Sequence, residues 1–228
     1  MITPRRLCFL LLACAGILAA PCTPVPAAFA QAGNVYTDSV TGLEFPENLG
    51  RMARGDTQDF EKNMPGLGTS IAYFANDASK AHIYIYNMKM RGIPSDPENS
   101  IIEDELKRSA GEITAMEDKG FYSNVKELDS GTATMGKEGM PRIRYKKFSF
   151  RIKDGSSHVS YLLMTGYKGN FFKVRYSYPE TLGEPGDKDA LRFIAALGKV
   201  LKAGEATTQG GAKQPLEAEE QPRMKIRK

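Results

Sequence analysis

The chain has 228 residues, with 31 Lys and Arg, 27 Asp and Glu, two His and three Cys. All three cysteines, Cys8, Cys14 and Cys22, lie in the first thirty residues, so a chain that loses this segment cannot use disulfides, thiolate nucleophiles or cysteine-bound metals. Without Arg5 and Arg6 the remaining 29 basic and 27 acidic residues leave a net charge of about +2, too small for a steering field over the whole protein. Nucleic acid is therefore disfavoured as a partner.

The first thirty residues resemble a signal peptide. Arg5 and Arg6 precede an apolar run from Leu7 to Ala20, and Ala28-Phe29-Ala30 supplies small residues before a cleavage site. We expect residues 1–30 to be removed and the protein to be periplasmic or secreted, with no transmembrane segment after processing. A lipoprotein signal cut before Cys14 is an alternative, but it would leave a very short apolar run; an uncleaved anchor is a third.

The next segment predicts a small hairpin and two strands. Residues 35–46 alternate weakly around Thr41-Gly42, and residues 47–68 show no clear period, so we expect mainly loop there, with a short strand possible near Arg51. Strands are predicted over 69–75 and 81–90. Both faces of the second are largely apolar, which indicates a strand covered on both sides and places His82 near the interior.

One helix is predicted to follow. Pro97 suits a helix start, with Ser95 or Asp96 as the cap, and Ile102, Leu106, Ile113 and Met116 form an apolar stripe that ends before Gly120. The acidic residues of its first turns, Glu98, Glu103, Asp104 and Glu105, are interpreted as a solvated face rather than a catalytic pair. A further strand is predicted over residues 122–134.

Residues 142–178 predict a three-stranded meander, with strands 142–153, 158–167 and 171–178. Asp154-Gly155 and Lys168-Gly169 suit two-residue turns. With that register Phe150 faces Val159, Phe148 faces Tyr161, Leu163 faces Val174 and Tyr161 faces Tyr176. All these apolar residues then share one core face, and a β-bulge at Lys146-Lys147 would add Ile143 and Tyr145 to it.

The same register predicts a basic face on the other side of the meander. Its candidate residues are Lys147, Arg151, Lys153, His158, Lys173 and Arg175. Their charges could hold phosphate or carboxylate groups of an anionic partner. The competing interpretation is an ordinary exposed sheet face, with the lysine and arginine stems lying over apolar neighbours. A helix covering this face would rule the site out.

The C-terminal part predicts one more helix and a tail. Residues 181–186 are expected to be a linker, and Leu191, Ile194, Leu197 and Leu201 give a helix over residues 187–203 its buried stripe. Residues 205–228 have almost no apolar content, so we expect a disordered polar tail. The predicted organisation is thus a signal peptide over 1–30, one domain over 31–204 and the tail.

Motifs for catalysis, phosphate loops, calcium loops and metal ligation are missing from the sequence. His82 and His158 lie far apart in the chain with no carboxylate beside either at a metal-binding spacing, so we expect no metal and no cofactor. Carboxylate-based hydrolysis stays open, because its residues can converge in the fold alone.

The pattern of elements resembles the PsbP/Mog1 type of α/β sandwich. A strand pair leads to Leu43-Glu44-Phe45-Pro46, a meander closes in 172–179 (FKVRYSYP), and the last helix carries Leu191-Arg192-Phe193-Ile194. The resemblance covers most of residues 35–203 in pattern and order, and it implies a mostly non-enzymatic accessory role. The strands and helices agree independently with an α+β fold, in which two helices pack on an antiparallel sheet.

We therefore expect an exported, non-enzymatic accessory or binding protein of the cell envelope. Its expected partner is an envelope protein, a glycan or a lipid headgroup, contacted through the basic sheet face. The alternative is a periplasmic hydrolase that uses carboxylates or His82.

Overall fold

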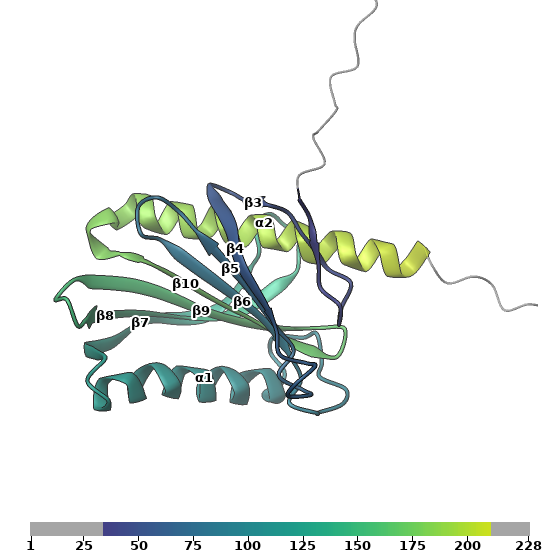
Figure 1. Ribbon diagram of the computed structural model, residues 1–228, viewed down its shortest axis with the longest axis horizontal. Coiled ribbons are helices and arrows are strands. Elements are labelled where there is room, and N and C mark those ends of the chain that lie inside the picture. Colours follow the sequence, from purple (N-terminus) through teal and green to yellow (C-terminus); the bar gives the residue numbers. More distant parts are fainter. Residues whose placement is uncertain (1–33, 211–228) are drawn as a thin grey trace, which may run out of the picture. The chain divides into compact units, whose positions relative to one another are not determined.

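The computed structural model describes residues 34–210, which form an antiparallel sheet with a helix on each face (Figure 1). The expected signal peptide and residues 211–228 lie outside the described residues. The main sheet has eight strands in the order β3-β4-β5-β6-β10-β9-β8-β7. Its strands are β3 (Asn48–Leu49), β4 (Met52–Asp59), β5 (Thr69–Phe74), β6 (Lys80–Tyr86), β7 (Tyr122–Thr134), β8 (Arg142–Ile152), β9 (Ser157–Tyr167) and β10 (Asn170–Pro179).

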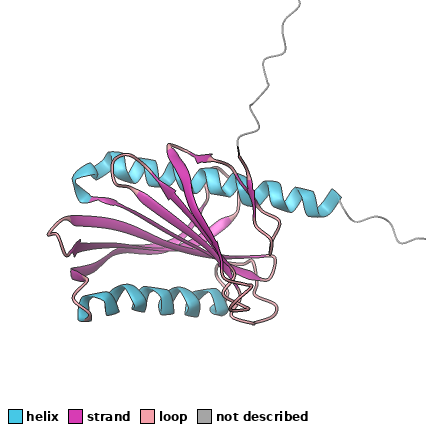
Figure 2. Cartoon of the chain, in the orientation of Figure 1, coloured by secondary structure: helices cyan, strands magenta, loops and turns pink. Residues whose placement is uncertain are grey.

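Two helices cover opposite faces of this sheet, α1 (Ser100–Asp118) and α2 (Gly183–Gly210), as Figure 2 shows. The α2 core gathers Phe193, Leu197 and Leu201 with the β9 and β10 residues Tyr161, Leu163, Val174 and Tyr176. The α1 core gathers Ile102, Leu106 and Ile113 with Leu162, Met164 and Phe171. Successive residues of β9 and β10 therefore enter different cores, which explains why both faces of these strands are apolar.

The α+β prediction is confirmed, with one departure near the N-terminus. The predicted hairpin exists as β1 (Tyr36–Thr37) paired with β2 (Glu44–Phe45). The segment predicted as mainly loop instead contains β3 and the whole of β4. Strand β4 reads MARGDTQD and is mostly exposed, so it offers no apolar alternation to detect; main-chain pairing with β5 makes it a strand.

Helix α1 ends before Gly120 as predicted, but both helices begin elsewhere than predicted and α2 continues into the predicted tail. Asn99 caps α1, because its Oδ1 accepts a hydrogen bond from the Ile101 amide at 3.0 Å, while Asp96 accepts from the Glu98 amide in the preceding turn. Helix α2 follows a 3-10 turn (Glu180–Leu182), begins at Gly183 and continues to Gly210. Pro185 lies in the first turn of α2, where a proline lacking its N–H breaks no hydrogen bond.

The meander has one register as predicted and one shifted by a residue. Leu163 opposes Val174 and Tyr161 opposes Tyr176, which confirms the tight Lys168-Gly169 turn. In the other hairpin Phe148 opposes Ser160 and Phe150 opposes His158, so the predicted pairings with Tyr161 and Val159 are wrong. The turn has three residues instead of two: the Ile152 amide donates to Ser156 O at 2.9 Å, and Gly155 takes the left-handed φ of +87°.

This one-residue shift turns β8 over relative to the predicted arrangement. Ile143 lies in the α2 core, whereas Phe148 and Phe150 lie in the α1 core. A bulge at Lys146-Lys147 is not needed, since the β8–β9 register is continuous there; the register shifts occur in β7, between Ser123 and Lys126 and between Glu127 and Asp129. The break in alternation marks the point where the apolar side chains of β8 change from the α2 face of the sheet to the α1 face.

Candidate functional site: a basic groove beside helix α1

The register divides the six predicted site residues between two faces. His158 (β9) and both Lys173 and Arg175 (β10) are on the α1 side of the sheet. Lys147 and Arg151 (β8) are on the α2 side, and Lys153 follows β8 in the turn. The prediction of one basic face carrying all six residues is therefore wrong, because it rested on a two-residue turn after β8.

Lys147 has a structural role on its own face. Its ammonium lies 2.8 Å from Asp187 Oδ1 in the first turns of α2, and the same carboxylate accepts hydrogen bonds from the Tyr161 hydroxyl at 2.6 Å and the Tyr178 hydroxyl at 2.5 Å. This Asp187 cluster fastens the start of α2 to the sheet. Lys147 is thereby already paired and does not present a charge to a partner.

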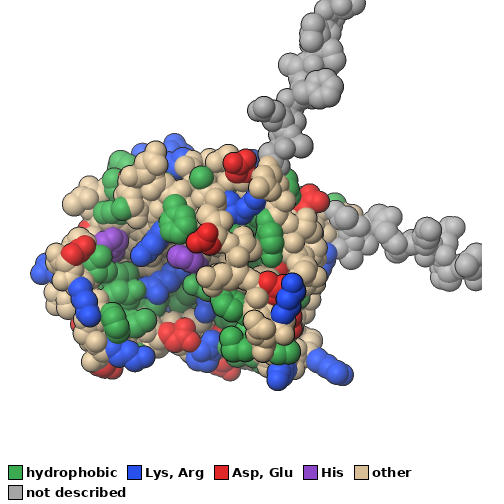
Figure 3. Space-filling view, in the orientation of Figure 1, with side chains coloured by type: hydrophobic (Ala, Val, Ile, Leu, Met, Phe, Trp, Pro, Cys, Tyr) green, Lys and Arg blue, Asp and Glu red, His purple; other side chains and the backbone are tan. Residues whose placement is uncertain are grey.

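Helix α1 covers this face over Leu162, Met164 and Phe171, so the whole face is not available as a binding site. His158 and Arg175 nevertheless join other residues to line a groove whose lining includes no residue of α1. A cavity of about 200 Å³ opens beside α1 over strands β6, β10, β9 and β8. Figure 3 shows both histidines on one face of the molecule, with Lys and Arg side chains between them and hydrophobic side chains around them. The residues that line this basic groove are Lys80, His82, Tyr84, Tyr122, Phe150, Ile152, His158, Arg175 and Ser177.

Arg175 is the central cation of the groove. Its guanidinium carbon lies 5.7 Å from the ring centre of Tyr122 and 5.8 Å from that of Phe150, and its Nη2 donates to the Tyr122 hydroxyl at 3.0 Å. Within residues 34–210 it forms no ion pair with a carboxylate. A half-buried guanidinium fixed over two rings, with its charge uncompensated, is suited to bind an anion.

Lys173 lies next to the groove on the same strand and is half-buried. Its ammonium is 4.9 Å from the ring centre of Tyr84 and 5.1 Å from that of Tyr86. Burial lowers the pKa of Lys173, and the charges of Glu112 and Glu105 oppose that shift only in part. The nearby Glu105 is buried rather than solvated as predicted, and it is occupied by Arg108 and by the Tyr86 hydroxyl. Lys173 thus adds a second positive charge without a carboxylate in contact.

The two histidines line the groove from different strands. His82 of β6 stacks on Tyr84 at 6.1 Å, and His158 of β9 stacks on Phe150 at 6.2 Å. Burial lowers the pKa of His82, and the positive charges of Lys80 and Arg175 lower it further. The Nδ1 of His158 is buried with no hydrogen-bond partner in the described part of the chain. A ligand that accepts or donates a hydrogen bond in the groove could satisfy this atom.

Residues 34–210 contain no group of three His, Cys, Asp or Glu side chains placed to hold a metal ion. Aromatic rings and cations line the groove, and the residues lining it include no carboxylate. This arrangement can bind an anionic group and cover it with ring faces, but it lacks the paired acids that carboxylate-based hydrolysis uses.

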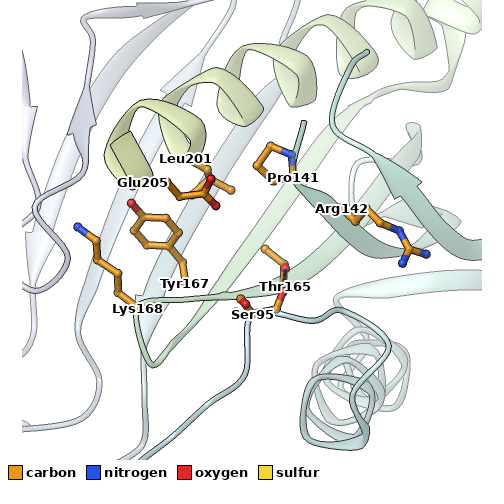
Figure 4. Close-up of a pocket in the computed structure, with 9 residues that line it drawn as sticks. Ser95, Pro141, Arg142, Thr165, Tyr167, Lys168, Leu201 and Glu205 are labelled. Atoms are coloured by element: carbon orange, nitrogen blue, oxygen red, sulfur yellow. Dashed lines mark hydrogen bonds between the residues drawn. The ribbon is translucent and has the colours of Figure 1, made fainter. Parts of the chain in front are cut away.

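A larger cavity, of about 390 Å³, lies between β9 and the last turns of α2 (Figure 4). Its charged groups do not converge. The Lys168 ammonium donates to the Thr41 carbonyl at 2.8 Å, and the Arg142 guanidinium pairs with Glu98 at 2.9 Å. The Lys168 ammonium also lies 5.4 Å from the ring centre of Tyr167, and Figure 4 shows Arg142 on the opposite side of the cavity. The basic groove is therefore the better candidate for a binding site.

Several groove residues were not predicted from the sequence. Lys80, Tyr84 and Tyr122 are not among the predicted site residues, Phe150 is predicted for the core face, and His82 is predicted to lie near the interior. The order of strands brings β6 next to β10, and this pairing between residues about ninety positions apart has no local signal. The alternation of β6 placed Lys80, His82 and Tyr84 on one face, but only the sheet order shows what they face.

Comparisons with known proteins find a likeness in structure and none in sequence. No protein-family model matches the sequence, and no curated protein matches it. In structure the chain is similar to cyanobacterial PsbP (CyanoP) from Synechocystis sp. PCC 6803, with a TM-score of 0.45, 14% identity, and coverage of 82% of this chain and 96% of that one. The likeness is to the same group that the sequence pattern resembles, and at this level it implies no shared ligand or activity.

Proposed function

We propose that this protein is an exported, non-enzymatic accessory protein of the cell envelope that binds an anionic group of a partner in the basic groove. The observation that carries the proposal is Arg175, a half-buried guanidinium that Tyr122 and Phe150 hold in place and that no carboxylate neutralises within residues 34–210. Most exposed cations gain little from their surface pairs, but a desolvated guanidinium with a fixed orientation gains more from an anion.

Three further groups would cooperate with Arg175. Lys80 and Lys173 bring positive charge from the neighbouring strand and the same strand, and His158 presents a buried ring nitrogen without a partner among the described residues. Phosphate, sulfate ester and carboxylate groups would all satisfy such donors. These are the anionic groups of envelope lipids, glycans and acidic proteins.

Hydrolysis through His82 has less support. The charged groups that act on His82 are Lys80 and Arg175, both cations, so no carboxylate in the described chain orients its imidazole as a general base. Groove-lining cations beside a histidine disfavour its protonated form, which a general base must reach during turnover.

The direct test is a titration of the mature protein with inorganic phosphate, followed by NMR of the histidine ring protons. We expect saturable shifts in both histidines, and an affinity at least about tenfold lower in Arg175→Gln, since hydrogen bonds to charged groups contribute roughly 1.5–3 kcal/mol. Arg151→Gln is the matched control, because Arg151 was predicted for the same face but lies on the α2 side. Equal loss in both variants, or no saturable shift, would overturn the groove as an anion site.

A cellular test addresses the partner and the location. A photoreactive residue at Phe74, whose ring contacts His82 at 6.1 Å, should crosslink the partner after export, and Arg175→Glu should abolish that crosslink. The same photoreactive residue at Leu128, which is equally exposed, should capture nothing specific. Recovery of the protein in the cytoplasmic fraction alone would contradict the envelope role.

A further inference from the structure

A second surface, separate from the groove, is formed by two loops that lie against each other. They are residues 60–68, between β4 and β5, and residues 87–93, after β6. The amides of Asn87 and Met88 donate to the Gly66 carbonyl at 3.2 and 2.8 Å, which fixes one loop on the other. We call these two loops the loop pair.

The loop pair carries four exposed apolar side chains. Met64, Leu67, Met88 and Met90 are each between 38% and 50% exposed, and they are four of the ten large hydrophobic side chains that are exposed within residues 34–210. Single exposed apolar residues are ordinary, but a cluster on two adjoining loops indicates contact with something apolar. Methionine is suited to irregular apolar surroundings because its side chain is flexible and polarisable.

Three cations lie in the same two loops as these side chains. Lys62, Lys89 and Arg91 are exposed, and none of them pairs with a carboxylate in the described chain. The acidic residue within the loops, Glu61, is turned inward, where its carboxylate accepts from the amides of Gly66 at 3.0 Å and Gly68 at 2.9 Å. The outer surface of the loop pair therefore combines apolar side chains with net positive charge.

The backbone of the loop pair is held in an unfavourable conformation. Met88 and Lys89, two consecutive residues other than glycine, have φ angles of +51° and +62°. Such residues cost about 1–3 kcal/mol each unless their surroundings fix them. Here the Asn87 side chain fixes them: its Oδ1 accepts from the Lys89 amide at 2.8 Å, and its amide group donates to Asn170 at 3.1 Å. The fold thus maintains the outward presentation of Met88 and Lys89 against local preference.

We propose that the loop pair docks on a membrane surface that contains anionic lipids. Met64, Leu67, Met88 and Met90 enter the headgroup region, and Lys62, Lys89 and Arg91 bind lipid phosphates. Exposed apolar side chains interspersed with lysine and arginine are the combination that binds such surfaces, because apolar burial and attraction to anionic lipids both contribute to the affinity. The loop pair contributes no residue to the basic groove, so the two sites can act independently.

The test is cosedimentation of the mature protein with vesicles of equal parts phosphatidylglycerol and phosphatidylcholine, compared with pure phosphatidylcholine. We expect binding to the anionic vesicles alone. The double variant Lys89→Gln with Arg91→Gln should weaken vesicle binding about twentyfold or more, because each cation near the surface contributes about fivefold. Met88→Ser with Met90→Ser should weaken it about tenfold or more through lost apolar burial.

Leu128→Ser with Leu191→Ser is the matched control, because these leucines are at least as exposed but lie on β7 and α2. This control should bind vesicles like the unchanged protein. A loss of binding in this control equal to that of the loop variants would overturn the proposal. Binding that survives both loop variants would also overturn it.

A fluorescence measurement keeps the test valid if a loop variant unfolds. The chain contains no tryptophan, so Met90→Trp introduces a single reporter. Its emission should shift to shorter wavelength with anionic vesicles and stay unchanged with pure phosphatidylcholine. An emission spectrum that does not shift with anionic vesicles would overturn the lipid proposal. Crosslinking of a photoreactive residue at position 90 to a protein would then identify a protein-docking surface.

Discussion

Arg175 of β10 and Tyr122 of β7 meet across two intervening strands, with the guanidinium Nη2 3.0 Å from the tyrosine hydroxyl. Phe150 lies between them in the sheet order and stacks on Tyr122 at 4.2 Å. The ring pair and the hydroxyl together orient the charge of Arg175 along the groove. An anion would meet a guanidinium whose side-chain entropy is already lost, which favours affinity.

Tyr122→Phe tests this orientation. The change keeps the ring stack and removes the one hydrogen bond from Arg175. We expect phosphate affinity to fall about threefold to tenfold, the worth of a typical net hydrogen bond of roughly 0.5–1.5 kcal/mol. Isothermal titration measures the change, and unaltered affinity would show that the rings alone position Arg175. Tyr145→Phe is a control, because that hydroxyl bonds Asp129 on the α2 side of the sheet.

Lys173→Met should stabilise the fold while weakening anion binding. Burial lowers the pKa of Lys173, which indicates that its charged form is incompletely compensated. Replacing it by an apolar side chain of similar length removes that cost, and we expect a gain of about 0.5–2 kcal/mol in unfolding free energy. Urea denaturation and phosphate titration on the same variant measure both effects. A destabilised variant would mean that the contacts with Tyr84 and Tyr86 outweigh the desolvation.

Protonation of His82 should destabilise the fold on mild acidification. Burial, aided by the charges of Lys80 and Arg175, lowers the pKa of His82 below its ordinary 6.5. The unfolded chain then binds a proton before the folded one does, so this contribution to stability is complete above pH 6.5 and is lost as the pH falls toward the lower folded pKa.

Urea denaturation over this pH range should show that loss, and His82→Gln should flatten it. Added phosphate should reduce it as well, because a bound anion favours the protonated imidazole. Identical pH profiles for His82→Gln and the unchanged protein would contradict this account.

Asp187→Asn should destabilise the fold strongly. The carboxylate holds Lys147, Tyr161 and Tyr178, and the amide would accept fewer of these bonds and leave the ammonium without a counter-charge. We expect a loss of about 2–4 kcal/mol in unfolding free energy. Glu184→Gln, which breaks only an exposed ion pair with Lys188, should change stability by less than about 1 kcal/mol.

The Asp187 cluster also affects the stability of the fold at low pH. Burial acts to raise the pKa of Asp187, but the hydrogen bonds from Lys147, Tyr161 and Tyr178 outweigh it and lower that pKa below 3.8. The stability from Asp187 is therefore present above pH 3.8 and is lost as the pH falls through the lower folded value. Acid unfolding of Asp187→Asn should lack this component.

Gly68→Ala tests the packing under the loop pair. A Cβ at Gly68 would lie 1.8 Å from the Ile85 carbonyl oxygen, and its φ of +60° disfavours any side chain. We expect a loss of about 2 kcal/mol or more, because backbone rather than a flexible side chain blocks the new atom. Gly139→Ala, at a φ of +77° with open space, should cost about 1 kcal/mol. Thermal unfolding distinguishes the two.

The elements with local signals can be predicted from the sequence alone. Strands β5 to β10, both helices and the register of β9 on β10 follow from alternation, helical stripes and the Lys168-Gly169 turn. These features depend on residues a few positions apart, so the local sequence pattern is enough to predict them. It also identified Arg175, Lys173 and His158 as members of one face.

Long-range contacts set which face each strand presents to each helix, and these contacts have no local signal in the sequence. Alternation could not orient β8, because helices cover both sides of the sheet and apolar residues lie on each. The turn after β8 has three residues rather than two, and this places Lys147 on the opposite face from Arg175. The groove likewise needed β6 to pair with β10, a contact between segments far apart in the chain. Local patterns set what each strand can bury, whereas long-range pairing sets which charges end up together.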